Sequence, residues 1–293
     1  AFLKQFLGVK LYVSVMGNGD LVWSEHPYQH KKIKKLLLQI YEKIIAFFFF
    51  QKADLVIAYN NHCGDYALCN GADAKKIRRT RIYPCIKHFD ATKVIPKAQL
   101  KNFPSTKKVV CMWSRFSYEK KIPFALEGAF EAMKKDRELG LCIIGYGSMF
   151  PEIEKMIKDS GVNNRISLLN FTPSYELTSY IYHSDLSLIP LGGYSLIEAC
   201  LLKKPIVCFD LEWHHELLTD GYSAYFADYP SSKQVCNKIL EALNNPQEAA
   251  KRAEIAYKRY VLLFDEKKLA DREKQIMAEF LEEFKPEEKQ KVS

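Results

Sequence analysis

Residues 186–209 read LSLIPLGGYSLIEACLLKKPIVCF, and this stretch indicates how most of the chain is built. Its two short runs, Leu186–Ile189 and Ile206–Phe209, consist almost entirely of apolar residues. A Gly-Gly turn and an amphipathic segment lie between them, and we predict a helix over residues 196–202. Apolar strands that are joined through helices are typical of a parallel sheet buried on both faces.

The same alternation continues on both sides of this stretch. It predicts a doubly wound α/β domain over residues 106–262, with a parallel sheet between two layers of helices. The further strands are expected at residues 109–113, 139–144 and 166–169, and the further helices at 122–133, from about 150, at 174–182 and at 233–243.

The first hundred residues repeat this pattern less completely. Strands are predicted at 10–15, 55–59 and 81–84, with a long basic helix over residues 31–51. Because two or three strands are few for this class, we expect residues 1–105 to be a truncated N-terminal domain and its linker. Residues 263–293 are predicted to form a charged crossover helix and a tail.

Composition excludes several classes of protein. The chain of 293 residues is 48% hydrophobic and 27% charged, as in ordinary globular proteins. No stretch reaches the roughly 18 apolar residues that a bilayer-spanning helix needs. The net charge of +8 attracts phosphate groups, whether on a nucleotide, an anionic lipid or a nucleic acid.

Cysteine placement indicates a reducing compartment. Cys111, Cys142 and Cys208 lie within apolar runs, where a thiol behaves as a small buried hydrophobic group. No CxxC pair occurs, so neither a zinc ribbon nor a thioredoxin-type site is indicated. We therefore expect a cytoplasmic protein.

Ligands of doubly wound folds bind beyond the carboxyl ends of the strands, so the loops there hold the candidate residues. Arg115 and Lys120 share the loop after the first strand of the domain and are suited to neutralising a diphosphate; alternatively, they are ordinary surface cations. Gly145 and Gly147 would let backbone approach a ligand, or would simply form a tight turn. The full G-x-G-x-x-G pattern is missing, which counts against a nicotinamide or flavin enzyme.

The segment from Pro190 to Cys200 is the most informative of these loops. Gly192 and Gly193 can offer backbone N–H groups to phosphates, and Glu198 can accept hydrogen bonds from a ribose diol. The alternative for Glu198 is an acid that stabilises the first turn of a helix. His214 and His215 are adjacent and should point to different faces of one helical turn, so we expect no metal site.

Asn60 follows a predicted strand and would be either a helix cap or an acceptor-site residue.

Several motifs occur in one order and together resemble the donor-binding domain of family 4 retaining glycosyltransferases of the GT-B fold. The resemblance covers roughly residues 106–285, and the segment around residues 53–58 is similar to the second half of that family's N-terminal domain. The motifs are Arg115-x4-Lys120, Ile144-Gly145-Tyr146-Gly147, Asn170-Phe171, residues 184–190, Ser195-Leu196-Ile197-Glu198-Ala199 and Lys204-Pro205-Ile206-Val207.

The resemblance implies a GT-B-like pair of Rossmann-like domains and a role for each matching residue. Arg115 and Lys120 would be catalytic residues that contact the donor diphosphate, and Glu198 would hold the ribose. Phe171 would lie near the base. The phosphate and sugar of the donor would be lined by Gly193, Tyr194, Ser195 and Leu196. The remaining donor-binding residues would be Gly145, Gly147 and Gly192.

The chain departs from the family pattern in three places. Pro190 stands eight residues before Glu198, where the family has a first carboxylate. Met16 occupies the place of a histidine near the transferred sugar. The family's opening strand and glycine-rich loop are absent, and we therefore expect the donor cleft to lack one wall.

The implied function is retaining, metal-independent transfer of a sugar from a nucleotide-sugar donor to a lipid-linked or polysaccharide acceptor. Such a reaction would serve polysaccharide or lipopolysaccharide biosynthesis and needs no cofactor besides the donor. One alternative is a non-catalytic nucleotide-binding remnant of such an enzyme. A nucleic-acid-binding protein is a third hypothesis, but the chain lacks a recognition signature and we expect no nucleic acid partner.

Residues 31–51 combine lysines with leucines, isoleucines and four phenylalanines. A basic helix with such residues can lie in a membrane interface, and each lysine adds about 1 kcal/mol near an anionic surface. Alternatively, the apolar residues pack on the N-terminal sheet. We predict peripheral association with an anionic membrane, on the inner face of the cell membrane.

Overall fold

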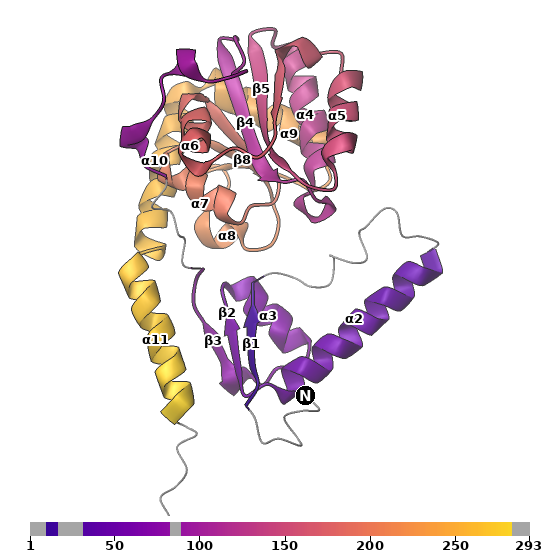
Figure 1. Ribbon diagram of the computed structural model, residues 1–293, viewed down its shortest axis with the longest axis vertical. Coiled ribbons are helices and arrows are strands. Elements are labelled where there is room, and N and C mark those ends of the chain that lie inside the picture. Colours follow the sequence, from indigo (N-terminus) through magenta and orange to yellow (C-terminus); the bar gives the residue numbers. More distant parts are fainter. Residues whose placement is uncertain (1–9, 17–31, 83–88, 283–293) are drawn as a thin grey trace, which may run out of the picture. The chain divides into compact units, whose positions relative to one another are not determined.

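A computed structural model describes residues 10–16, 32–82 and 89–282 of the chain (Figure 1). It divides into two compact units. Unit 1 combines residues 1–83 with 264–293, and unit 2 spans residues 84–263. Each unit is described by itself.

Unit 2 contains a six-stranded parallel sheet in the order β6-β5-β4-β7-β8-β9. This arrangement confirms the predicted α/β fold with a parallel sheet. The chain runs outward from β4 through β5 to β6, then returns to place β7 against the other side of β4. The strands are β4 (Lys108–Arg115), β5 (Leu139–Tyr146), β6 (Ile166–Leu169), β7 (Leu186–Ile189), β8 (Ile206–Phe209) and β9 (Tyr225–Ala227).

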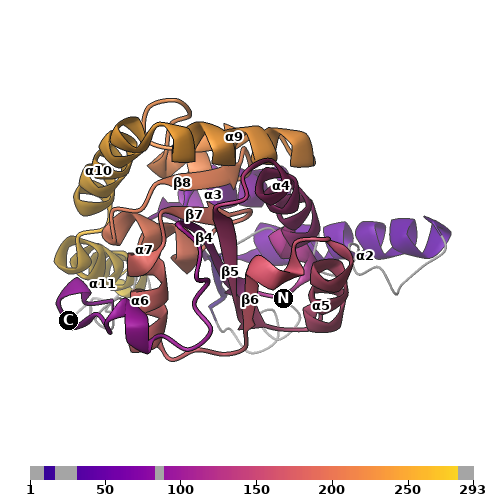
Figure 2. The same cartoon turned by 90° about the horizontal axis from the view of Figure 1, so that it is seen from above.

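Helices cover both faces of this sheet (Figure 2). One layer contains α4 (Ile122–Lys135), α5 (Phe150–Asp159) and α9 (Ser232–Asn244), and the other contains α6 (Ser174–His183), α7 (Tyr194–Leu201) and α10 (Pro246–Leu263). The short helix α8 (His214–Leu217) follows β8. Fully buried Met112, Leu141 and Ile143 lie in the core between strands and helices.

The cysteines behave as the sequence indicated. Cys111 and Cys142 are register partners on β4 and β5, and both are buried and free. Cys208 on β8 is also buried and free. Burial in the apolar core raises the pKa of the Cys111 and Cys208 thiols, because it disfavours the charged thiolate.

The segment before β4 packs against α6. The backbone N–H of Ile95 donates to Ser179 Oγ over 2.9 Å, and the hydroxyl of Tyr180 donates to the carbonyl of Lys101 over 2.7 Å. Unit 2 spans residues 84–263 and so includes this segment, which the sequence predicted to be a linker. The reason is that α6 side chains satisfy backbone groups of a segment that reads as a linker.

Unit 1 contains a three-stranded parallel sheet in the order β1-β2-β3. Its strands are β1 (Tyr12–Val15), β2 (Leu55–Ala58) and β3 (Ile77–Arg79). The sequence placed the third strand from Arg81 onward, whereas β3 ends at Arg79 and residues 81 and 82 form no strand; residues 83 and 84 lie outside the described residues. The basic run around Arg78 and Arg79 obscured a strand in which only Ile77 is buried.

Three α-helices and a short 3-10 helix, Ala74–Lys76, complete the described part of unit 1. The α-helices are α2 (Lys32–Lys52), α3 (Asn61–Cys69) and α11 (Glu266–Glu282). Asn60 caps α3, since its side chain accepts from the backbone N–H of Cys63 over 2.6 Å. This contact agrees with the helix-cap interpretation.

Helix α11 belongs to unit 1. Ile276 and Phe280 pack against Leu55 and Ile57 of β2, and the Tyr59 hydroxyl donates to Glu273 over 2.7 Å. The expected tail, residues 283–293, lies outside the described residues, as do Lys31 and the first nine residues.

Candidate functional site

The predicted site residues lie on loops at the carboxyl ends of neighbouring parallel strands. Val110 of β4 pairs with Leu186 of β7, and the chain reverses its winding direction between these two strands. Such a switch point opens a crevice above the strand ends, where doubly wound proteins bind ligands. One loop follows β4 and carries Arg115 and Lys120; the other follows β7 and carries Gly192 and Gly193.

Arg115 is an exposed cation with a local counter-charge. Its side chain is 65% exposed, and its guanidinium contacts the Glu119 carboxylate over 2.5 Å. Burial opposes ionisation of Glu119, but hydrogen bonds from Ser117 and the backbone, together with Arg115, outweigh it and lower the pKa of that carboxyl. Arg115 is therefore held by a partner that an incoming anion can replace.

Lys120 lies in a different environment from Arg115. Burial is the main cause of its lowered pKa, and the charge of Arg115 lowers it further, while Glu119 and Glu212 act in the opposite direction. The Lys120 side chain is half-buried, whereas Arg115 is exposed.

Gly145 and Gly147 serve close backbone packing. Their φ angles are +154° and +149°, and a Cβ on either would lie 1.9 Å from the Ser114 carbonyl oxygen or 2.3 Å from that of Phe116. The loop after β5 can therefore press against the end of β4 only because both residues are glycine. The observed contacts favour the tight-turn interpretation of this motif.

An exposed aromatic pair stands at the ends of β5 and β6. Phe171 is 71% exposed and Tyr146 is 56% exposed, and their ring centroids lie 5.8 Å apart in an edge-to-face arrangement. Sequence reasoning identified Phe171 but missed Tyr146. The signal was available, since each aromatic residue comes at or directly after the end of one of two neighbouring strands.

Glu198 is a half-buried carboxyl rather than an acid of the first helical turn. The first turn of α7 contains no acidic residue, and Glu198 lies further along the helix. The indole N–H of Trp113, on β4, donates to its carboxylate over 2.6 Å. Burial raises the pKa of Glu198 to about 7, although the bond from Trp113 acts in the opposite direction. Trp113 was not singled out from the sequence.

The Gly-Gly loop is held from the turn after β8. The Gly192 N–H donates to His214 Nε2 over 3.0 Å, and Trp213 Nε1–H donates to the Gly192 carbonyl over 3.2 Å. His214 Nδ1 lies 2.8 Å from the Phe209 carbonyl oxygen. Sequence reasoning considered His214 only as a metal ligand and did not detect this contact.

The two adjacent histidines do lie in different environments. His214 is fully buried, whereas the side chain of His215 is largely exposed and contacts Asp210. Burial lowers the pKa of His214 to about 4, and Lys120 and His215 lower it further. Within residues 10–16, 32–82 and 89–282, no three His, Cys, Asp or Glu side chains gather as metal ligands would.

The rest of the Gly-Gly loop is open on one side. A Cβ on Gly193 would meet nothing within 4 Å, and Tyr194 is half exposed. Leu196 is fully buried, so only its backbone could line a bound donor. Ser195 is partly buried at the start of α7.

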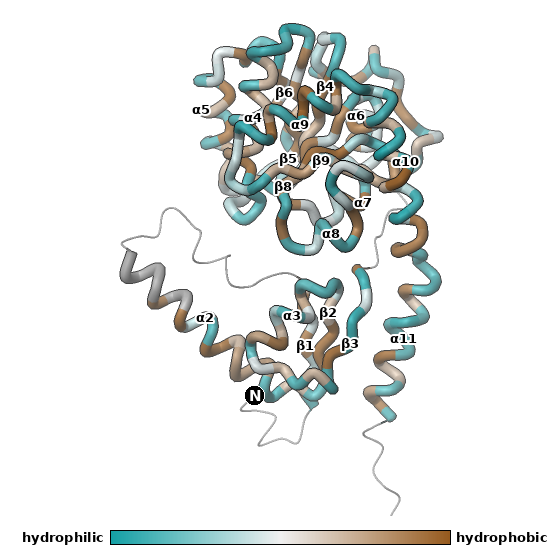
Figure 3. Tube along the Cα trace, turned by 180° about the vertical axis from the view of Figure 1, so that it is seen from behind, coloured by the Kyte–Doolittle hydropathy of each residue, from teal (hydrophilic) through white to brown (hydrophobic). Residues whose placement is uncertain are grey.

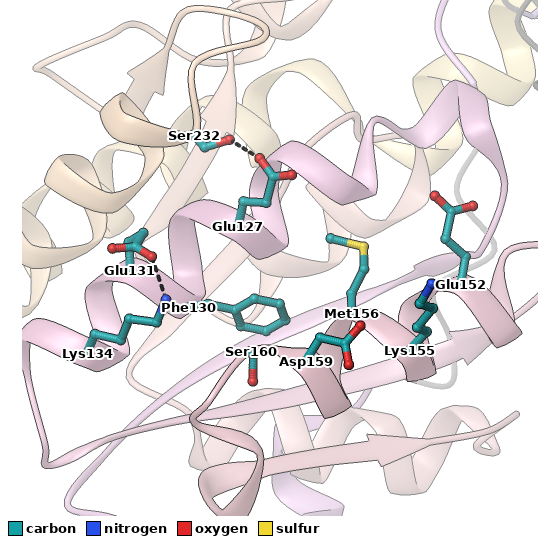
Figure 4. A pocket seen from close by; sticks show the side chains of 10 residues that line it. All are labelled: Glu127, Phe130, Glu131, Lys134, Glu152, Lys155, Met156, Asp159, Ser160 and Ser232. Carbon is teal, nitrogen blue, oxygen red and sulfur yellow. Dashed lines mark hydrogen bonds and ion pairs between the residues drawn. The ribbon is translucent and has the colours of Figure 1, made fainter.

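A groove of about 600 Å³ lies elsewhere on unit 2, between α4 and α5. Figure 4 shows the carboxylates of Glu127, Glu152 and Asp159 around the apolar side chains of Phe130 and Met156. None of the predicted site residues lines this groove. Its lining holds four carboxylates against the two lysines Lys134 and Lys155, which disfavours a phosphate-bearing ligand.

The comparisons with known proteins agree with this geometry. The family described as "Glycosyl transferases group 1" matches residues 96–259, which is more than half of the chain. The chain belongs to this family of glycosyltransferases.

Relatives of known activity match part of the chain. The poly(ribitol-phosphate) alpha-N-acetylglucosaminyltransferase of Staphylococcus aureus is 30% identical over 148 residues, which are 50% of this chain and 30% of that protein. The alpha-D-kanosaminyltransferase of Streptomyces kanamyceticus is 23% identical over 152 residues, 50% of this chain and 39% of that protein. The chain thus matches well under half the length of these relatives.

Solved structures share the fold. Anabaena Alr3699/HepE in complex with UDP and glucose has a TM-score of 0.74 at 18% identity, over 96% of this chain and 74% of that one. The sucrose-phosphate synthase of Thermosynechococcus elongatus has a TM-score of 0.78 at 17% identity, over 96% of this chain and 70% of that one. These likenesses confirm the α/β fold of GT-B glycosyltransferases, with unit 2 as the C-terminal Rossmann-like domain.

Proposed function

We propose that the protein is a glycosyltransferase that uses a nucleotide-sugar donor and binds the donor on unit 2. The observation that carries the proposal is that two cations, an open glycine loop and a half-buried carboxyl lie on neighbouring strand ends at one switch point of the sheet. Membership of the glycosyltransferase family supports the reaction class. The Anabaena structure is of a complex with UDP and glucose, and we extend a UDP-linked donor to this chain.

Each group has a role in the proposed chemistry. Arg115 exchanges Glu119 for the donor diphosphate, and with Lys120 it stabilises the negative charge that develops on the leaving group. Glu198, held by Trp113, accepts hydrogen bonds from the ribose hydroxyls. Tyr146 and Phe171 offer exposed rings on which a base can stack.

We further propose retention of configuration and neutralisation of the diphosphate by Arg115 and Lys120 without a metal ion. The family resemblance supports retention of configuration. The position of Arg115 and Lys120 at the end of β4 supports neutralisation of the diphosphate without a metal ion. The acceptor would be lipid-linked or a polysaccharide. The cysteines of the described part of the chain are all free, which supports a cytoplasmic location.

Binding and turnover separate the enzyme from a remnant that only binds nucleotide. Calorimetry with UDP measures binding, and release of UDP from UDP-glucose or UDP-N-acetylglucosamine measures turnover. We expect both. Binding without turnover of any UDP-sugar would favour the remnant, and absence of both would contradict the proposal.

A membrane-facing surface is proposed on α2. Figure 3 shows apolar residues in brown along this helix. Leu37, Ile40, Tyr41, Ile44 and Phe48 share one helical face and are exposed, while Phe50 packs in the unit 1 core. The packing alternative therefore holds for Phe50 but not for this face.

The helix sequence KIKKLLLQIYEKIIAFFFFQK holds five lysines and one glutamate, which supports an anionic lipid surface. Among the described helices, none is both long and apolar enough to cross a membrane.

Co-sedimentation with vesicles tests this surface. We expect binding to phosphatidylglycerol vesicles that weakens at high salt and in Phe48→Ser. The matched control is Leu281→Ser, which changes an exposed leucine of α11. Binding that is absent, or equal on neutral vesicles, would remove the membrane proposal.

A further inference from the structure

Gly192 is a loop residue whose two backbone polar groups are both bound by side chains from another loop. The indole of Trp213 donates to its carbonyl, and His214 accepts from its N–H. Trp213 directly precedes α8 and His214 is its first residue, some twenty residues further along the chain. Trp213 is largely buried and His214 is completely buried, so water does not compete for either bond.

The two glycines at the end of this loop have no side chains that could fix their peptide groups, whereas Leu191 before them is buried. A Cβ on Gly192 would lie 2.7 Å from Leu196 Cβ, so the close packing leaves no room for one. Gly193, the residue before α7, makes no side-chain cap and borders open space. The direction of the peptide groups after Gly192 is therefore set by Trp213 and His214.

The protonation pattern of His214 follows from its two partners. A carbonyl oxygen can only accept, so Nδ1 carries the proton and donates to Phe209. Nε2 is then free to accept from the Gly192 N–H. A charged imidazole would place an N–H against an N–H, and complete burial disfavours that charge. The neutral ring thus links the end of β8 to the loop after β7.

Two charged residues, Lys120 and Glu212, link the His214–Gly192 contact to the proposed diphosphate site. Lys120 lies near enough to His214 to disfavour a positive charge on it, and Glu212, in the same turn as Trp213, favours the charge of Lys120. The turn after β8 thus faces both the cation and the glycine loop.

We propose that Trp213 and His214 are positioning residues for the donor diphosphate: they hold the Gly192 peptide from both sides and so aim the following backbone N–H groups of the loop. This inference rests on the proposed function. The two side chains touch the loop and not the donor, so their contribution is to keep the cradle in its binding direction before the donor arrives.

Four variants of the full chain test the inference. His214→Leu removes both hydrogen bonds and keeps a buried apolar group. Trp213→Phe removes the indole N–H and keeps a smaller aromatic ring. His214→Gln restores an amide that can donate and accept, and His215→Gln is the matched control on the neighbouring, exposed ring. Calorimetry gives the dissociation constant for UDP, and steady-state kinetics gives KM and kcat for a UDP-sugar.

We expect His214→Leu to raise the UDP dissociation constant and the donor KM about tenfold, equivalent to ~1.4 kcal/mol, with little change in kcat. Trp213→Phe should raise both about threefold, and His214→Gln should return them to within about threefold of wild type. His215→Gln should match wild type. A purely structural role would instead lower the melting temperature and the active fraction, leaving KM unchanged.

Unchanged UDP affinity and KM in folded His214→Leu and Trp213→Phe would overturn the inference. If His214→Leu does not fold, Trp213→Phe decides the question, because it keeps an aromatic ring, though a smaller one, at this position. A wild-type chain that neither binds UDP nor turns over a UDP-sugar would overturn the proposed function and this inference together. Wild-type binding with unaffected variants would overturn the inference alone.

Discussion

The loop after β4 and the loop after β7 meet at one switch point but are held in opposite ways. The first carries its charge on Arg115, an exposed side chain paired with Glu119. The second has no charge and is fixed by two buried hydrogen bonds to Gly192. Exposed ion pairs contribute about 0–1 kcal/mol and exchange readily, whereas buried polar contacts are costly to break.

This difference suggests how one site can recognise a diphosphate and release it. A rigid backbone cradle sets where the phosphates lie, and an adaptable cation closes on them once they arrive. Rigidity and charge are supplied by separate loops, so each can be perturbed alone. The following experiments use that separation.

Removing the cations should give the largest effect. We expect Arg115→Ala to lower turnover about 10²–10³-fold, because loss of one preorganised contact to developing charge has that magnitude. Lys120→Ala should act similarly. The melting temperature of Arg115→Ala should stay near wild type, since its side chain is exposed.

The control is Lys134→Ala, which removes a cation paired with Glu131 on the far part of α4. Near-normal turnover in both Arg115→Ala and Lys120→Ala would show that the donor site is assigned wrongly.

The buried, neutral His214 that holds the Gly-Gly loop should make the stability of the protein depend on pH. Burial lowers the pKa of His214 to about 4 in the folded state, below its ordinary value of 6.5. The folded protein then binds fewer protons than the unfolded chain between these values. Stability from neutral His214 is complete above pH 6.5 and falls as the pH drops toward 4, by about 3 kcal/mol in total.

His214→Gln should lack this loss, which urea unfolding of both proteins at pH 7 and pH 4.5 can measure. Equal losses in wild type and variant would contradict a buried neutral His214.

Glu198 should affect donor affinity in a pH-dependent way. Burial raises the pKa of its carboxyl to about 7, so it is protonated below neutral pH and becomes a carboxylate above it. A carboxylate is the stronger acceptor for ribose hydroxyls. We expect Glu198→Gln to raise the UDP dissociation constant about tenfold at pH 8 and much less at pH 6.

Calorimetry at the two pH values checks this difference. Glu198→Ala should weaken binding at both, because it also leaves the Trp113 N–H without its acceptor. Unchanged affinity in both variants would leave Glu198 with a structural role only.

The aromatic pair should give the smallest effect. Phe171→Ala should weaken UDP binding several-fold, since stacking of a base on an aromatic ring contributes roughly 1–3 kcal/mol at a well-formed site and less where both faces are wet. Tyr146→Ala should do the same. Tyr175→Ala, at another exposed tyrosine of unit 2, is the control. If Phe171→Ala and Tyr146→Ala both bind UDP as tightly as wild type, the base does not stack on these two rings.

Much of the unit 2 fold was predictable because its strands are buried on both faces. Leu186–Ile189 and Ile206–Phe209 begin and end where the sequence predicted, since an apolar run flanked by turn residues has few alternatives. The short strand β9, by contrast, was missed, because three residues give too little periodicity. In unit 1, β3 was missed for a different reason, because two of its three residues are arginines.

The candidate site was predictable only where a residue is informative by its own type and place. Arg115, Gly192 and Glu198 stand next to strand ends, and the order of the motifs gave them roles. Trp113, Trp213 and His214 have no such local signal, because their partners lie twenty or more residues away in the chain.

The sequence alone determined the alternation of strands and helices and the set of loops at one edge of the sheet, since both depend on local patterning of apolar and turn residues. The tertiary structure determined which of these loops contact one another and which side chains hold them in place. The Trp113–Glu198 bond and the Gly192 contacts exist because β4, β7 and β8 lie side by side in the sheet. Contacts between distant segments depend on packing geometry, which the periodicity of a single segment does not contain.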